Sequence, residues 1–142
     1  MTISYKYKYI KRQDGVQKKL PYIPINLKGN CSFWVEVMAL LDSGADVSVI
    51  PLDVAQLLDL DLTGEENKAN GLGGEVRIKN SKMLVNVKHA HEDYNFNIPV
   101  QVILDKTKAP PIIGREGFFD KFSIEFDHLN QRIKLKRNIP KQ

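Results

Sequence analysis

The 142-residue sequence has one cysteine, Cys31, and no apolar run near the roughly 18 residues that a membrane-spanning helix needs. A single cysteine excludes an internal disulfide framework and fits a reducing compartment. The stretch at residues 1–15 also lacks the continuous apolar core of a secretory signal. We therefore expect a cytoplasmic protein without membrane association, and the start at Met1 favours a stand-alone protein.

The sequence also lacks the patterns of a metal site and of a nucleic-acid-binding arm. No cysteine or acidic grouping stands at metal-ligand spacing around its three histidines, which are His89, His91 and His128. The net charge of +4 is mild, and the lysines and arginines are spread over both ends of the chain. We expect no metal, no cofactor and no nucleic-acid partner.

What is present indicates one compact domain, residues 1–142. The hydrophobic fraction of 42% is enough for a core in a chain of this length, and no repeat, linker or low-complexity stretch divides it. Alternating tyrosines and lysines at residues 5–9 predict a strand, and Asp14-Gly15 predicts a turn. Further strands are expected at residues 20–27, 33–41, 76–78, 83–87, 96–104, 123–126 and 132–135, with short helices starting at Pro51 and spanning 116–121. About nine short strands and two short helices favour a compact, mostly β, barrel-like fold.

The stretch LLDSGADVSVIP at residues 40–51 holds Asp42 directly after an apolar strand. An ionised carboxylate in an apolar setting needs hydrogen bonds, a counter-charge or a proton. Asp42-Ser43-Gly44 alone could be an ordinary turn at a strand end. However, the glycine-rich NGLGG follows about 30 residues later and PIIGR about 70 residues later. Three such spaced elements are hard to obtain by chance.

With these elements the sequence resembles the retropepsin-like aspartic proteases, a family of retroviral proteases and their cellular and prokaryotic relatives. The resemblance covers residues 20–136, which leaves residues 1–19 as an N-terminal extension strand and residues 137–142 as a tail. It implies a closed β barrel with a flap hairpin. It also implies a homodimer with a shared active site, because each subunit of the family supplies one such triplet and this chain has only one.

The resemblance assigns the catalytic role to Asp42, Ser43 and Gly44. Two Asp42 carboxylates held close together cannot both ionise, so they share a proton. One carboxylate then activates a water molecule, while the other donates a hydrogen bond to the scissile carbonyl. Ser43 would tie the two catalytic loops together, and Gly44 leaves room for the carboxylates. No metal or cofactor is required.

The resemblance also implies a substrate-binding set around the catalytic triplet. Asp46 would bind the substrate main chain and pair with Arg115, which follows Gly114, within the same subunit. The expected flap consists of Gly71, Leu72, Gly73 and Gly74. Apolar substrate pockets are expected from Leu40, Ala45, Val49, Leu72, Pro110 and Ile112.

The leading functional prediction is an aspartic endopeptidase that cleaves extended, largely apolar peptide segments. The alternative is a retropepsin-like dimerisation module that binds peptides or proteins with little or no turnover. A third hypothesis is a basic β barrel that binds nucleic acid, and it predicts an affinity that falls steeply with salt.

Overall fold

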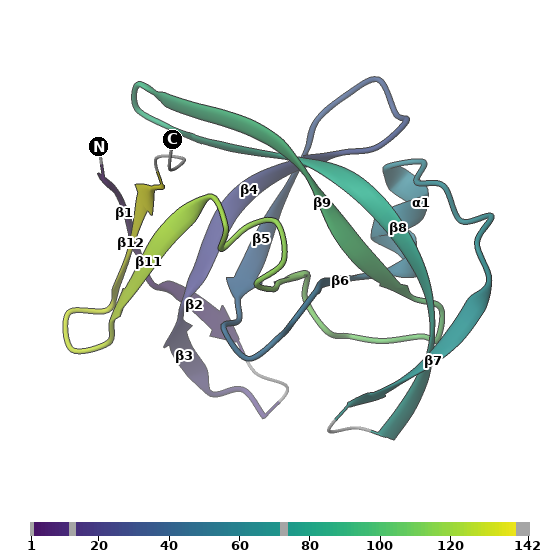
Figure 1. The fold of residues 1–142 in the computed structure, drawn as a ribbon. Helices are drawn as coiled ribbons and strands as arrows, with labels where there is room; N and C mark the ends of the chain where they lie inside the picture. The colour runs from purple at the N-terminus through teal and green to yellow at the C-terminus, as the bar shows by residue number, and fades with distance from the viewer. Residues whose placement is uncertain (1, 12–13, 72–73, 139–142) are drawn as a thin grey trace.

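The structure is a computed structural model, and it describes residues 2–11, 14–71 and 74–138. Figure 1 shows a β-rich molecule with one short helix on its side. The elements in chain order are β1 (Thr2–Lys6), β2 (Lys8–Lys11), β3 (Gln17–Leu20), β4 (Tyr22–Lys28), β5 (Val35–Leu41), β6 (Ser48–Pro51), α1 (Leu52–Leu57), β7 (Glu66–Gly71), β8 (Gly74–His89), β9 (Glu92–Ile103), β10 (Ile112–Ile113), β11 (Phe122–Asp127) and β12 (Arg132–Arg137).

The main sheet closes on itself. Its strand order is β4-β5-β10-β6-β9-β8-β7, and β4 also pairs with β8, so six strands form a closed barrel and β7 lies outside it. The predicted mostly β, barrel-like fold is confirmed. α1 is the one helix among the described residues, and its six residues are too few to cross a bilayer.

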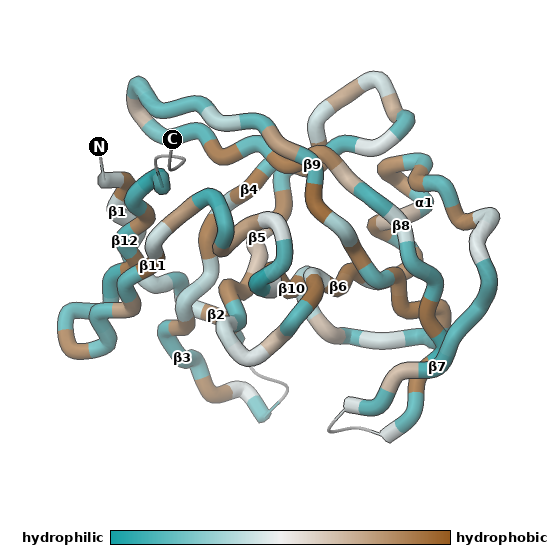
Figure 2. Tube along the Cα trace, in the orientation of Figure 1, coloured by the Kyte–Doolittle hydropathy of each residue, from teal (hydrophilic) through white to brown (hydrophobic). Residues whose placement is uncertain are grey.

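The barrel forms because its strands alternate between buried and exposed residues. In β4, Ile23, Ile25 and Leu27 are each at most 2% exposed while the residues between them are half-buried. Successive strand residues face opposite sides of a sheet, so one set of side chains fills the barrel. Figure 2 shows hydrophobic residues along β6 and β9 through the middle of the molecule, and a mostly hydrophilic outer end of the β8–β9 hairpin.

The N-terminal segment is more than the single strand that the tyrosine alternation predicted. β1 pairs with β12, from Thr2 opposite Lys136 to Lys6 opposite Arg132, so the first and last described strands lie in one three-stranded sheet. The chain leaves this sheet at Tyr7, whose N–H donates to the Gln131 carbonyl oxygen at 2.8 Å. β2 then forms a separate hairpin with β3, which includes the predicted turn at residues 14–15.

Three other local predictions were wrong. Residues 116–121 form successive turns instead of a helix, because Gly117 has a φ of +81° that interrupts helical geometry. The segments 76–78 and 83–87 belong to one strand, β8, which pairs with β9 continuously from Ile78 to His89. α1 begins at Leu52, one residue after the predicted Pro51, which is extended at the N-cap.

Candidate active site

Asp42 lies where β5 leaves the barrel, and β10 holds it from the side. β10 lies between β5 and β6. It pairs in parallel with β5, where Ile113 is opposite Leu41, and antiparallel with β6, where Ile112 is opposite Val49. The Asp42 N–H donates to the Ile113 carbonyl oxygen at 3.0 Å. The backbone of Asp42 is therefore fixed by a strand about 70 residues further along the chain.

The turn after Asp42 supplies one backbone N–H to its carboxylate and one to its backbone carbonyl. The Gly44 N–H donates to Asp42 Oδ1 at 2.9 Å, and the Ala45 N–H donates to the Asp42 carbonyl oxygen at 3.2 Å. A Cβ atom on residue 44 would lie 3.2 Å from Asp42 Oδ1, so glycine keeps this side of the carboxylate open. Asp42 is half-buried, Ser43 is exposed, and Asp42 Oδ2 has no hydrogen-bond partner among the described residues.

The residues after β10 lock the rest of the loop in place. The buried Gly114 N–H donates to Ser48 Oγ at 3.0 Å, and the Arg115 N–H donates to the Ala45 carbonyl oxygen at 2.9 Å. A Cβ atom on residue 114 would lie only 2.6 Å from the Val47 carbonyl carbon, so this close approach requires glycine. Ser48 was not predicted as a site residue, although a polar residue inside the apolar stretch around β6 was the available signal.

Asp46 and Arg115 meet in an ion pair between Asp46 Oδ1 and Arg115 Nη2. Both side chains are largely exposed, 75% for Asp46 and 53% for Arg115, and exposed ion pairs contribute only about 0–1 kcal/mol to stability. The pair therefore orients the Asp46 carboxylate more than it stabilises the fold. It also neutralises the second carboxylate of the Asp42 loop.

Three of the predicted apolar pocket residues lie side by side. Ile112 stands between Leu40 on β5 and Val49 on β6, so the three form a row across the sheet. All three are half-buried, as are Ala45 and Pro110, so none belongs to the fully buried core. A row of this kind can receive apolar side chains of a ligand.

The predicted flap glycines fall on the β7–β8 hairpin. Pairing between β7 and β8 continues out to Gly71 opposite Gly74, while Leu72 and Gly73 lie outside the described residues. In Figure 1 this hairpin projects toward the same lower side of the view as the loop after β5. At its base, Arg77 Nε donates to Asp105 Oδ1 at 3.0 Å and Arg77 N donates to Asp105 Oδ2 at 2.7 Å. The pKa of Asp105 is lowered, first by that backbone hydrogen bond and then by the guanidinium of Arg77.

A family model described as aspartyl protease matches residues 23–116, which include Asp42, Asp46 and Arg115. The chain belongs to the aspartyl protease family. The resemblance to retropepsin-like aspartic proteases predicted from the sequence is thereby confirmed. None of the curated proteins matches this aspartyl protease-family chain in sequence.

Three solved structures share the fold. A retropepsin-like aspartic protease from Rickettsia conorii has a TM-score of 0.56 at 18% identity, covering 95% of this chain and 91% of its own. EIAV protease complexed with the inhibitor HBY-793 has a TM-score of 0.51 at 20% identity, covering 69% of this chain and 84% of its own. The retroviral protease-like domain of Ddi1 from Leishmania major has a TM-score of 0.50 at 20% identity, covering 82% and 94%. At identities this low, the structural likeness shows a shared fold and nothing beyond it.

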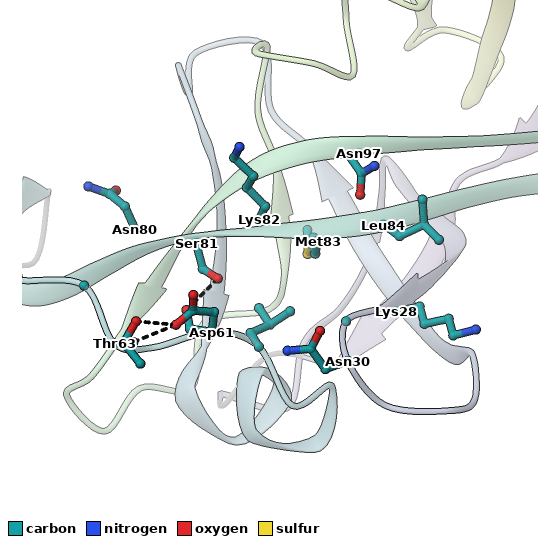
Figure 3. Close-up of a pocket in the computed structure, with 13 residues that line it drawn as sticks. Lys28, Asn30, Asp61, Thr63, Asn80, Ser81, Lys82, Met83, Leu84 and Asn97 are labelled. Carbon is teal, nitrogen blue, oxygen red and sulfur yellow. Dashed lines mark hydrogen bonds between the residues drawn. The ribbon is translucent and has the colours of Figure 1, made fainter.

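A cavity of about 650 Å³ lies away from Asp42-Ser43-Gly44, between β8 and the loop after α1. Figure 3 shows the Asp61 carboxylate directed toward Thr63, whose N–H and Oγ1 donate to it at 2.9 and 2.6 Å, while Ser81 Oγ donates to the Asp61 carbonyl oxygen. The pKa of Asp61 is lowered, chiefly by the Thr63 hydroxyl. These groups fix the loop against β8, and no residue of the Asp42 loop or of β10 lines the cavity. Over residues 2–11, 14–71 and 74–138, no group of three or more His, Cys, Asp or Glu residues could hold a metal ion.

Proposed function

We propose that this protein is an aspartic endopeptidase that acts as a homodimer, with one Asp42 carboxylate from each copy. The observation that carries the proposal is the state of Asp42. Its backbone is locked by β10, its Oδ1 accepts the Gly44 N–H, and its Oδ2 has no partner among the described residues. The other carboxylate of the loop, Asp46, is paired with Arg115, so it is not free to act with Asp42.

The proposed reaction uses two carboxylates that share one proton. At close range both cannot ionise, so one remains protonated. The ionised carboxylate takes a proton from a water molecule that attacks the scissile carbonyl carbon, and the protonated carboxylate donates a hydrogen bond to the carbonyl oxygen. A proton passes to the amide nitrogen as the C–N bond breaks, which releases the amine. The Gly44 N–H stabilises the ionised form by a charge-assisted hydrogen bond.

The substrate is proposed to be an extended, largely apolar peptide segment. The row formed by Leu40, Ile112 and Val49 would receive its side chains, and Asp46 would accept hydrogen bonds from its main chain. The β7–β8 hairpin would act as the flap that closes over the bound peptide. The exposed hydroxyl of Ser43 would cross to the catalytic loop of the partner copy.

We retain a cytoplasmic location as part of the proposal. Cys31, the single cysteine of the sequence, is half-buried and unpaired, as is usual for a protein in a reducing compartment.

Cleavage of a peptide library from mildly acid to neutral pH tests the reaction. Asp42→Asn should abolish product at every pH, because the amide cannot act as a base. Asp61→Asn is the matched control, since Asp61 also accepts a backbone N–H two residues ahead but lies in a different loop. Equal product from wild type and Asp42→Asn would refute the mechanism. Tight peptide binding by the wild type without any cleavage would instead support the non-catalytic binding module.

A mixing experiment tests whether two chains share one site. Adding an equal amount of Asp42→Asn chain to wild type should, after subunit exchange, halve the activity to about 50%, because half of the wild-type chains then sit in mixed dimers. Sites contained within single chains would keep full activity. Sedimentation at several protein concentrations would show the dimer directly, and a monomeric chain that cleaves peptides would contradict the shared site.

A further inference from the structure

A second hollow, of about 410 Å³, lies where the start of β2 and the end of β3 meet the turn between β11 and β12. Four of its lining side chains are cationic and none is acidic. The cationic residues are Lys6, Lys8, Lys19 and Arg132. A concave surface lined by one sign of charge concentrates ligands of the opposite sign.

These four cations have no ion pair within the part of the chain that the structure describes. Lys19 Nζ lies 4.8 Å from the centre of the Tyr9 ring, which is 66% exposed. The nearby carboxylate of Asp127 already accepts the Asn130 N–H at 3.1 Å and Asn130 Nδ2 at 2.9 Å. The pKa of Asp127 is lowered mainly by these hydrogen bonds, with smaller contributions from Lys134 and Arg132. Asp127 therefore compensates part of the charge of Arg132. The charges of the three lysines of the hollow, Lys6, Lys8 and Lys19, remain uncompensated.

The hollow is close to the candidate catalytic loop. The Leu41 N–H donates to the Pro21 carbonyl oxygen at 3.4 Å, which places the end of β3 beside Asp42. Lys19 precedes Pro21 by two residues, so its Cα lies within about 16 Å of the Asp42 Cα. An extended peptide covers this distance in about five residues. Figure 1 shows the β2–β3 hairpin between the β11–β12 turn and the loop after β5.

The β2–β3 hairpin also offers free strand edges. Within the described residues, β2 and β3 pair only with each other. An extended peptide leaving the proposed Asp42 site could therefore hydrogen-bond along an edge while its side chains reach the lysines. A nucleic acid would need a longer cationic track along its backbone than this one hollow supplies.

We propose that this hollow binds acidic side chains of the substrate, about five residues from the bond that is cleaved. This inference rests on the proposed function, and it adds a substrate class to it: an apolar segment flanked by aspartates or glutamates. The hollow acts as a second binding point outside the proposed Asp42 site.

Binding to Asp42→Asn protein tests the site without any need for catalysis. Two peptides with the same apolar segment are compared by titration calorimetry, one with a flanking run of Asp and Glu and one with Asn and Gln. The acidic peptide should bind about eight-fold more tightly at low salt, because three exposed ion pairs each contribute roughly two-fold. Lys8→Gln with Lys19→Gln should remove most of this difference, and 0.5 M salt should do the same, since it reduces the screening length to only a few ångströms.

The matched control changes Lys88 and Lys108 to Gln, since both are exposed and neither lines the hollow. This control should keep the preference for the acidic peptide, and circular dichroism should show that both double variants are folded. Equal affinity for the two peptides would overturn the inference, as would tighter binding of a single-stranded oligonucleotide at the same lysines. If binding depends on charge as expected but wild type cleaves neither peptide, the inference about the hollow is supported and the proposed function is refuted.

Discussion

Gly114→Ala adds one methyl group where the backbone after β10 passes closest to the Asp42 loop. The new Cβ atom would lie 2.6 Å from the Val47 carbonyl carbon, 2.7 Å from the Val47 oxygen and 2.9 Å from the Ala45 oxygen. Favourable contacts between carbon atoms lie at about 3.5–4.0 Å, so the two backbones must separate by roughly 0.5–1 Å. Neither neighbour is a flexible side chain, so the strain cannot be relieved by a rotamer change.

Such overpacking destabilises a protein by about 1–3 kcal/mol. Separation of the backbones also weakens the hydrogen bond from the Gly114 N–H to Ser48 Oγ, and a buried donor left unpaired costs about 1–3 kcal/mol. We therefore expect Gly114→Ala to lower the free energy of unfolding by about 2–4 kcal/mol. With a urea slope of about 2 kcal/mol per molar, the unfolding midpoint should fall by roughly 1–2 M.

The assay is urea unfolding followed by circular dichroism at one fixed protein concentration, because dimerisation would make the midpoint depend on concentration. Gly64→Ala is the matched control: its added Cβ would meet only the Asn80 oxygen, at an ordinary 3.8 Å. That variant should move the midpoint very little. If Gly114→Ala and Gly64→Ala give the same midpoint, β10 does not clamp the Asp42 loop in the way described.

Ser48→Ala should lower the free energy of unfolding by about 1–3 kcal/mol in the same urea assay, because it removes the acceptor of the buried Gly114 N–H. Asp46→Asn should change stability by less than about 1 kcal/mol, since its pair with Arg115 is exposed, but should raise KM for peptide cleavage. Burial raises the pKa of Tyr5 to about 12. The unfolded tyrosine ionises near pH 10, so stability should fall as the pH rises from about 10 to 12. Tyr5→Phe should reduce that fall in unfolding scans without removing it, because the pKa values of Tyr7 and Tyr22 are also raised, chiefly by burial.

Each of these predictions has a contrary outcome. An unchanged midpoint for Ser48→Ala would mean that another group takes over as acceptor for Gly114. A large loss of stability in Asp46→Asn would mean that the ion pair supports the fold itself. Tyr5→Phe should not destabilise the protein at neutral pH, because the buried Tyr5 hydroxyl has no partner within the described residues. A clear loss there would show a missed hydrogen bond.

The fold class could be predicted because local patterns carry it. The apolar residues before Asp42 form β5. In β9, a later barrel strand, more buried and less buried residues alternate along the chain. Long-range pairing could not be read in this way. β10 has only two residues, too few for any periodicity, yet it joins β5 to β6. Two separate strands were predicted at residues 76–78 and 83–87, but pairing with β9 carries β8 through the residues between them as one strand.

Residues of the candidate site could be predicted where the residue type alone indicates a role. They could not be predicted where the role depends on packing. Asp46 and Arg115 could be matched because opposite charges at family positions imply a pair, and the structure brings them together. Ser48 was missed because its role depends on where the Gly114 N–H points, which no local sequence pattern reveals. The basic hollow was missed for a similar reason, since Lys19 and Arg132 meet Lys8 only through folding.

The geometry of one chain also explains why the proposed reaction requires two. Hydrolysis of an amide needs a base for water and an acid for the carbonyl oxygen in the same step, and a single carboxylate cannot serve as both. Asp46 is held by Arg115, so it cannot supply the missing acid. The exposed Ser43-Gly44 turn leaves Asp42 accessible at one end of the barrel, where a twofold axis would bring an identical turn against it. In the proposed dimer, symmetry would supply a second Asp42, and the shared proton would make two identical residues act differently.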